Sequence, residues 1–449
     1  MAKIAPMSGF PEWLPAQRMV EQQIVGRVRE TFELHGFAPI ETRSVEPLDQ
    51  LLRKGETDKE IYLLRRLQAE AEEGDAGLGL HFDLTVPFAR YVLENAGKLD
   101  FPFRRYQIQK AWRGERPQEG RYREFLQADI DVVDRDTLPF HYEVELPLIV
   151  AEALDRLPIP SVRMHVNTRK IPEGFYRGLG LPDYLAVLRT VDKLAKIGPA
   201  KVHALLVETA GCSDAQAQAC LGLAQISSTD GSFAEQVRAL GARDPLLDQG
   251  LDELTRVIEA GRAQREGLFV ADLSVARGLD YYTGTVYETV MVGHEHIGSI
   301  CSGGRYDALA SDGSISYPGV GLSVGITRLL GRLFGQGLLD ASRKVPTCVL
   351  VALPDEESRD SCAKTAALLR ARGIASHVAP EPDKYGKQIK YAERRGIPYV
   401  WFPQPDGTAQ VRDIRSGEQV DADVGRWTPP DVDLRPSIVD RAQFVEGAP

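Results

Sequence analysis

The chain has 449 residues, 43% of them hydrophobic and 26% charged, and these values are typical of globular proteins. Its net charge of −10 argues against broad binding to nucleic acid, although a local basic stripe can still bind phosphates. No apolar run approaches the roughly 18 residues that a membrane helix needs, and the N-terminus has no secretory signal pattern. The five scattered cysteines form no CxxC pair, so we expect reduced thiols in a cytoplasmic protein.

The first part of the chain combines one amphipathic helix with strands. Apolar residues recur at every fourth position from Val20 to Phe32, which predicts a helix that stops at Gly36. Alternation over 38–42 predicts a strand, and a second strand fits 80–87.

The residues after 168 show a different pattern of predicted helices and strands. Residues 168–265 are mainly helical in pattern, strand-like alternation returns at 275–290, and the polar segment 335–344 predicts a linker. Beyond it, strands and helices alternate as β-α-β-α-β, which predicts a doubly wound domain closed by a hairpin at Ser416-Gly417. These five elements cover residues 345–353, 358–372, 374–379, 385–395 and 399–402.

Two predicted strands, at about 104–113 and 124–133, each have one polar face. Period-2 geometry places four side chains of the second strand in a row, namely Phe125, Gln127, Asp129 and Asp131. The corresponding row of the first strand is Arg105, Gln107, Gln109, Ala111 and Arg113. Such rows line either a ligand cleft or a solvated surface, and the pattern alone leaves both interpretations open.

The loop between these strands carries three arginines, with Arg113 at its entrance. Guanidinium groups at that density suit a polyphosphate, because each offers forked donors and a fixed charge. Composition alone does not separate nucleotide binding from a surface ion-pair network.

Five segments form a set of motifs in chain order. They are Asp83-Leu84-Thr85-Val86-Pro87, the stretch from Phe103 to Gln127 with Arg113-x-Glu115-Arg116-Pro117-Gln118 in it, Arg277–Glu288, Ser302–Asp307 and Gly319–Leu330. Together they resemble the motifs of histidyl-tRNA synthetases, over residues 36 to 330. The segment beyond them resembles that family's anticodon-binding domain.

This resemblance implies a class II synthetase fold. An α+β catalytic domain built on an antiparallel sheet would span 1–334, with a helical insertion at about 168–265, and an α/β anticodon-binding domain would span 345–435. The implied activity is that of a histidine–tRNA ligase: ATP-dependent activation of L-histidine to histidyl-adenylate and its transfer to tRNA(His). A homodimer is also implied. The proline expected in motif 1 is Arg43 here, which leaves the interface detail open.

Activation requires positive charge at the α-phosphate of ATP. The attacking carboxylate is already an anion, so the site must supply positioning and charge, and no protein base is needed. The resemblance implies that Arg113 and Arg277 act catalytically at the α-phosphate. An ion pair between Arg277 and Asp280 is the structural alternative.

The remaining ATP contacts are also implied by the resemblance. Phe125 would stack on adenine, with Arg328 on the opposite face of the base. Glu115 would lie near the base and Arg121 near the terminal phosphates. Mg²⁺ would be bound with ATP between its outer phosphates, and no metal site made by the protein alone is expected.

Specificity for histidine would depend on the imidazole, which offers one donor and one acceptor in its neutral form. By resemblance, Asp131 accepts from one ring nitrogen, Tyr282 meets the other and Tyr281 lines the pocket. The α-ammonium and carboxylate would be held by Asp83, Thr85, Gln127, Arg113 and Arg277. Gly303 and Gly304 would let the backbone approach the amino acid, with a plain tight turn as the alternative.

Contacts with tRNA are implied in two places. Arg116 and Gln118 in the motif 2 loop would approach the acceptor end. In the C-terminal domain, a basic stripe at three- or four-residue spacing suits either RNA backbone contact or a solvated helix face, and it comprises Lys384, Lys387, Lys390 and Arg394.

The leading alternative function is a non-catalytic, histidine-sensing paralogue, the regulatory subunit of ATP phosphoribosyltransferase. Such proteins typically lose the Arg277-type motif and the anticodon domain, and this sequence has both. A synthetase for another amino acid is disfavoured by Tyr281-Tyr282 together with Ser302–Asp307. A dehydrogenase is disfavoured because no glycine-rich turn follows the first strand of the C-terminal domain.

Overall fold

The computed structural model describes residues 5–54, 60–66, 77–117, 120–181, 183–275, 281–311, 313–404 and 408–442. The chain divides into two compact units. The larger unit contains Val25–Arg332 and the residues before Glu12, and the smaller unit contains Glu12–Ile24 and the residues from Leu333 to the end of the described chain. Within the described ranges, no helix is long and apolar enough to cross a membrane.

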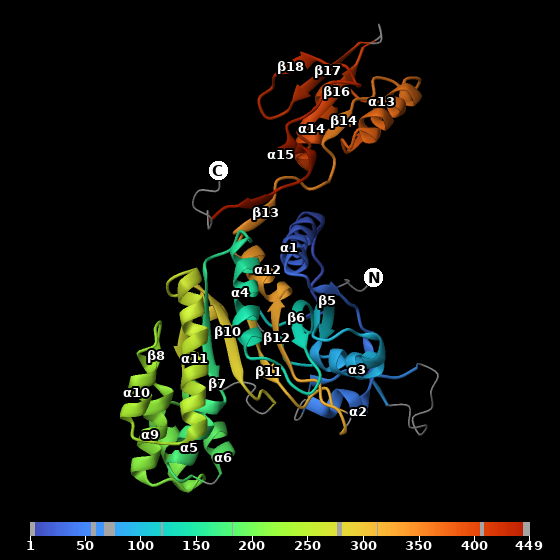
Figure 1. Ribbon diagram of the computed structural model, residues 1–449. Helices are drawn as coiled ribbons and strands as arrows, with labels where there is room; N and C mark the ends of the chain where they lie inside the picture. Colours follow the sequence, from blue (N-terminus) through green and yellow to red (C-terminus); the bar gives the residue numbers. More distant parts are fainter. Residues whose placement is uncertain are drawn as a thin grey trace. The chain divides into compact units, whose positions relative to one another are not determined.

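The larger unit is built on a nine-stranded sheet in the order β1-β5-β6-β12-β11-β10-β7-β9-β8 (Figure 1). Its strands are β1 (Ala38–Pro39), β5 (Phe103–Trp112), β6 (Glu124–Val133), β7 (Val162–Thr168), β8 (Ser227–Ser228), β9 (Phe269–Asp272), β10 (Thr285–Met291), β11 (Cys301–Tyr306) and β12 (Gly319–Gly325). Only β1–β5 and β7–β9 pair in parallel within this sheet. The predicted α+β unit on a largely antiparallel sheet is therefore confirmed.

Helix α1 (Pro15–Leu34) follows its predicted pattern. Its four apolar residues at i+4 spacing, Val20, Ile24, Val28 and Phe32, have no exposed surface. Gly36 ends the helical segment with a φ of +78°, a left-handed conformation that favours glycine.

The strand predicted at 80–87 is wrong beyond Leu80. Strand β4 (Leu78–Leu80) pairs with β2 (Val45–Pro47) and with β3 (Leu63–Leu64), and α3 begins at Thr85 and continues to Asn95. Pro87 lies in the first turn of α3, where no backbone N–H is needed for the helix ladder. Alternating apolar residues over so short a run fit the start of a helix as well as a strand.

Two other predicted strands are shorter than expected. The strand predicted at 38–42 is only β1, and the strand predicted at 275–290 begins at Thr285 in β10. Of the intervening segment, residues 276–280 lie outside the described residues.

The predicted helical character of 168–265 is confirmed. Helices in this segment are α5 (Lys170–Gly178), α6 (Tyr184–Val191), α7 (Leu194–Ile197), α8 (Pro199–Glu208), α9 (Asp214–Ala224), α10 (Phe233–Ala239) and α11 (Pro245–Gln264). Helices α5 and α11 pack closely because Gly174 has no side chain. A Cβ at Gly174 would lie 2.4 Å from the backbone nitrogen of Leu247.

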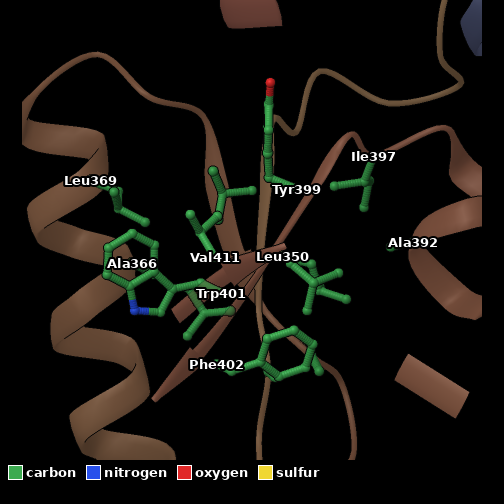
Figure 2. Packing of buried hydrophobic residues seen from close by; sticks show 14 of the residues in the cluster. Leu350, Ala366, Leu369, Ala392, Ile397, Tyr399, Trp401, Phe402 and Val411 are labelled. Atoms are coloured by element: carbon green, nitrogen blue, oxygen red, sulfur yellow. The ribbon is translucent and has the colours of Figure 1, made fainter. Parts of the chain in front are cut away.

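The smaller unit has the predicted β-α-β-α-β order with a closing hairpin. Its sheet order is β15-β14-β16-β17-β18, in which the first three strands are parallel and the last two antiparallel. Its elements are β14 (Val349–Val351), α13 (Arg359–Ala371), β15 (Ser376–Val378), α14 (Tyr385–Arg395), β16 (Tyr399–Pro403), β17 (Ala409–Asp413), β18 (Gln419–Asp421) and α15 (Asp431–Leu434). Figure 2 shows Leu350 and Trp401 of the sheet between Leu369 of α13 and Ala392 of α14.

The linker predicted at 335–344 is more ordered than its composition suggests. Helix α12 (Ile326–Gly335) reaches into it, and β13 (Leu339–Ala341) pairs antiparallel with β19 (Ile438–Asp440). The partner strand lies about 100 residues away in the chain, so no local pattern could indicate this pairing.

Arg43, the residue in the place of the motif 1 proline, binds a buried carboxylate. Glu46 has no exposed surface and pairs with Arg90 at 2.6 Å and with Arg43 at 3.1 Å. Glu94, whose side chain is 47% exposed, joins Arg90 at 2.8 Å. An arginine at position 43 therefore has a structural partner within the chain.

Removing the buried carboxylate should strongly destabilise the larger unit. Glu46→Ala leaves Arg90 buried without its main partner, which typically costs about 3–5 kcal/mol. Glu94→Ala is the matched control, because an exposed pair contributes roughly 0–1 kcal/mol. Thermal unfolding of both variants measures the difference, and equal midpoints would show that the pair contributes little.

Candidate functional site

The two polar strand faces predicted from the sequence form one continuous surface. In the β5–β6 ladder, Arg105 lies opposite Asp131, Gln107 opposite Asp129 and Gln109 opposite Gln127. The solvated-strand interpretation is wrong, because Gln127, Asp129 and Asp131 are 9%, 2% and 3% exposed. A buried row of amides and acids requires partners, and among the described residues the structure supplies them except at Gln127 Oε1.

A cavity of about 390 Å³ opens beside this row. Among the residues predicted for the site, it is lined by Arg113, Glu115, Arg121, Phe125, Gln127, Tyr281, Tyr282, Gly303 and Arg328. A smaller pocket shares Tyr282 with it and is also lined by Thr85 and Asp131. Asp83 is buried two residues before Thr85, and its Oδ1 accepts a hydrogen bond from the backbone N–H of Val86 at 3.1 Å.

Some predicted site residues are not brought to this cavity. Arg116 is exposed in the motif 2 loop, and Gly304 lies in β11 next to the lining residue Gly303. Arg277 and Gln118 lie outside the described residues.

Three arginines, Arg113, Arg121 and Arg328, line the larger cavity. Arg113 donates from Nε to the carbonyl of Phe82 at 3.0 Å, and its guanidinium carbon lies 5.1 Å from the centre of the Phe125 ring. Arg328 donates from Nη2 to the carbonyl of Ile297 at 2.8 Å. Arg121 pairs with Glu115 at 3.4 Å, so the ion-pair interpretation holds for that pair. The Nε of Arg113 also lies 4.0 Å from Glu60 Oε2.

Asp131, which lines the smaller pocket, has two buried partners. Tyr306 donates its hydroxyl to Oδ1 at 2.8 Å, and Arg105 lies 2.7 Å from Oδ2. Gly321, opposite Asp131 on β12, is required there, since a Cβ at this position would lie 1.9 Å from Oδ1. A carboxylate oxygen can accept more than one hydrogen bond.

Asp129 is the second buried acid of the row. Its Oδ1 accepts a hydrogen bond from Ser323 Oγ at 2.5 Å. Burial raises the pKa of Asp129 to about 7, with Asp131 and Asp83 adding to the rise while Arg105 opposes it. This carboxyl therefore titrates near neutral pH.

The tyrosine pair and the two glycines are fixed by close packing. The ring centres of Tyr281 and Tyr282 are 4.0 Å apart, and burial raises the pKa of Tyr281 strongly, so that its hydroxyl stays protonated. Gly303 and Gly304 belong to β11, so the tight-turn alternative is wrong. A Cβ at Gly303 would lie 2.0 Å from the carbonyl of Gly321, and one at Gly304 would lie 2.7 Å from that of Thr285.

The predicted basic stripe lies at α14 in the smaller unit. Lys384, which caps the helix, is exposed, as are Lys387, Lys390 and Arg394. Lys387 pairs with Asp383 at 2.8 Å. The last three basic residues line a groove together with the acids Glu381, Asp383 and Glu393. The groove therefore has mixed charge.

Several residues that shape the site were not predicted as part of it. Arg105 has the same strand phase as Gln107 and Gln109, and that phase is the signal that could have found it. Tyr306 lies in the Ser302–Asp307 motif, whose match to the family could have indicated it. Ser323 has no local signal, because only its register against Asp129 brings it to the row.

The architecture and the comparisons with known proteins agree. The histidyl-tRNA synthetase family model matches residues 9–329, and an anticodon binding domain model matches residues 347–426. The crystal structure of histidyl-tRNA synthetase from a Nostoc species has a TM-score of 0.83 and 34% identity, covering 94% of this chain and 97% of that one. The fold is thus that of a class II aminoacyl-tRNA synthetase.

Similarity to curated proteins extends over nearly the whole chain. Histidine–tRNA ligase from Cutibacterium acnes is 58% identical over 98% of this chain and 99% of that protein, and the one from Micrococcus luteus is 58% identical over 99% and 100%. The chain belongs to the histidyl-tRNA synthetase family, an ATP-using family, as the motifs predicted. A Bacillus halodurans protein described as ATP phosphoribosyltransferase regulatory subunit/histidyl-tRNA synthetase has a TM-score of 0.71 at 20% identity, which shows a shared fold alone. The regulatory-subunit alternative is therefore disfavoured.

The raised pKa of Asp129 predicts a pH-dependent contribution to stability. An unfolded aspartate titrates near pH 4. Between about pH 4 and 7 the folded chain holds a proton at Asp129 that the unfolded chain has lost. This group therefore lowers the free energy of unfolding as the pH rises through that window.

Asp129→Asn should remove this contribution. The difference in thermal midpoint between the variant and the unmodified chain should favour the variant more at pH 8 than at pH 5. Asp136→Asn, at an exposed position beyond β6, is the matched control. An Asp129→Asn difference of the same size at both pH values contradicts the prediction.

Proposed function

We propose that the cavity of the larger unit activates L-histidine with ATP and that the chain then transfers histidine to tRNA(His). The observation that carries this proposal is a cavity lined by three arginines beside a buried row of acids and amides, of which Gln127 lines the cavity and Asp131 lines the smaller pocket that shares Tyr282 with it. Phosphates suit the arginines, and an amino acid with a donor-bearing ring suits the buried row.

In the activation step, a carboxylate oxygen of histidine attacks the α-phosphorus of ATP. The bond from that phosphorus to the bridging oxygen breaks, and pyrophosphate leaves with its electron pair. Arg113 lines the cavity together with Gln127 and would stabilise the charge on the α-phosphate. Arg277 would act at the same phosphate, as its motif implies. Their task is positioning and charge stabilisation, since the nucleophile needs no deprotonation.

The remaining nucleotide contacts follow from the cavity lining. Phe125 would stack on adenine, with Arg328 on the other face of the base and Glu115 nearby. Arg121 would exchange its contact with Glu115 for the terminal phosphates. Its present pairing is part-exposed, so the competing ion pair is weak.

Mg²⁺ is proposed as the ion that accompanies ATP. In the described parts of the chain, no group of three or more His, Cys, Asp or Glu residues could hold a metal by itself. The cavity offers Glu115 and Glu288 as carboxylates. This donor set fits Mg²⁺, which takes most of its ligands from phosphates and water and would neutralise charge on the outer phosphates.

Different side chains would bind the imidazole and the α-ammonium of histidine. Asp131, fixed by Tyr306 and Arg105, would accept from one imidazole nitrogen, while Tyr282 meets the other and Tyr281 lines the pocket. The α-ammonium would be held by Asp83, Thr85 and Gln127, and the backbone at Gly303 and Gly304 would lie close to the substrate. A pocket built on hydrogen bonds can reject analogues that lack the partner group by roughly 10⁴-fold or more.

Transfer to tRNA would use the second unit as well. A hydroxyl of the terminal ribose attacks the carbonyl carbon of the adenylate, and AMP leaves. Arg116 and Gln118 would approach the acceptor end. Lys384, Lys387, Lys390 and Arg394 would contact the RNA backbone from the anticodon-binding domain, proposed at 345–435 beside a catalytic domain at 1–334. A cytoplasmic homodimer completes the proposal, supported by the family assignment.

ATP–pyrophosphate exchange with each amino acid in turn tests the proposal. Exchange should depend on histidine and on no other amino acid at comparable concentration. Activity with a different amino acid, or with none, would refute the proposed function.

Asp131→Asn should weaken the use of histidine selectively. The substitution keeps the side-chain volume and replaces a charge-assisted hydrogen bond with a neutral one, which costs roughly 1–2 kcal/mol, or about 5–30-fold in the KM for histidine. The KM for ATP should change by less than about threefold, because the nucleotide contacts other residues. Asp136→Asn is again the control for a distant, exposed acid. Equal changes in both KM values would assign Asp131 a structural role.

A further inference from the structure

A row of three hydrogen-bonded side chains crosses from β6 to β12 beside the cavity. Gln127 and Asp129 lie two residues apart on β6, and Ser323 of β12 is opposite Asp129 in the register. Gln127 Nε2 lies 2.7 Å from Ser323 Oγ, which in turn lies 2.5 Å from Asp129 Oδ1. Both β6 side chains are more than nine-tenths buried, so bulk water does not compete for these bonds.

When Asp129 is ionised, the chemistry of the three groups fixes the direction of the row. The carboxylate then only accepts hydrogen bonds, so the single hydroxyl hydrogen of Ser323 points to Asp129. Ser323 Oγ is then an acceptor toward Gln127, and only the amide nitrogen of Gln127 can donate to it. The amide oxygen is forced to the opposite side.

That oxygen is left without a partner among the residues that the structure describes. Gln127 Oε1 is buried and accepts no hydrogen bond there. A buried amide oxygen in this state is costly and needs a donor. Gln127 lines the cavity together with Ser323, so the missing donor belongs to whatever the cavity binds.

We infer that Ser323 and Asp129 are positioning residues that hold the amide of Gln127 with its oxygen toward the α-ammonium of histidine. This inference rests on the proposed function, in which Gln127 contacts that ammonium. An ammonium has three donors and no acceptor, so an amide turned the other way would present its NH₂ group to it and repel it. The pair thereby selects ligands that carry an amino group over desamino analogues.

The surroundings of Asp129 are consistent with this role. Arg105 of β5 favours the ionised carboxylate, whereas Asp131 of β6 and Asp83 disfavour it. Tyr282, Tyr306 and Cys301 face the same region. A bound ammonium adds one positive charge and stabilises the ionised state on which the direction of the row depends.

The test compares ligands with and without the amino group on the full chain. Ser323→Ala removes the anchor of the Gln127 amide and should raise the KM for histidine roughly 5- to 100-fold in ATP–pyrophosphate exchange, with the KM for ATP within about twofold. Inhibition by histidinol, which keeps the amino group, should weaken in parallel. Inhibition by imidazolepropionate, which lacks it, should stay unchanged. Ser323→Thr keeps the hydroxyl and should restore most of the histidine affinity.

A double variant shows whether Ser323 acts through Gln127. Gln127→Ala/Ser323→Ala should have the histidine KM of Gln127→Ala alone, and additive losses would overturn the inference. Equal weakening of both inhibitors by Ser323→Ala, or no weakening of either, would overturn it as well. If Ser323→Ala does not fold, Asp129→Ala gives the same readout, because it removes the acceptor that holds the hydroxyl hydrogen of Ser323. Absence of histidine-dependent exchange in the unmodified chain would instead refute the proposed function.

Discussion

A buried ion pair between Arg105 and Asp131 crosses the β5–β6 ladder, and the buried acids beside the cavity depend on it. Three carboxylates, those of Asp83, Asp129 and Asp131, are buried close together, and Arg105 is the cation that the structure places among them. Without it, burial and mutual repulsion would drive these acids toward their protonated forms. Loss of either partner would leave an uncompensated charge in the interior.

The same ladder determines which side chains face the cavity and the smaller pocket beside it. A slip of one residue would turn Gln127, Asp129 and Asp131 away from the cavity and place apolar neighbours there. The register is specified by burial on both faces, since Leu126, Ala128, Ile130 and Val132 pack on the opposite side. In the proposed function, specificity for the amino acid is therefore a property of strand pairing, whereas the proposed nucleotide contacts come partly from the loop that joins the two strands.

Strand phase and helix periodicity predicted the local parts of the molecule. The polar rows of β5 and β6, helix α1 and the order of elements in the smaller unit follow from spacing of two or about four residues. Contacts between distant segments could not be predicted from residue spacing. Ser323 reaches Asp129 across 194 residues of chain, and Gly321 makes room for Asp131 only because of the β6–β12 register. Short apolar runs also gave a wrong prediction, since the strand expected to continue to Pro87 is the start of a helix there. Four or five residues do not distinguish a strand from the start of a helix.

The pairing of β13 with β19 brings together the two ends of the segment Leu339–Asp440. The chain thus enters and leaves the α/β sheet and its helices at adjacent points. A protein shortened between 341 and 349 would keep β13 and lose its partner, leaving a strand with unpaired backbone groups as a template for aggregation. The natural place to separate this module is therefore before Leu339, and a module excised from there carries its own closing ladder.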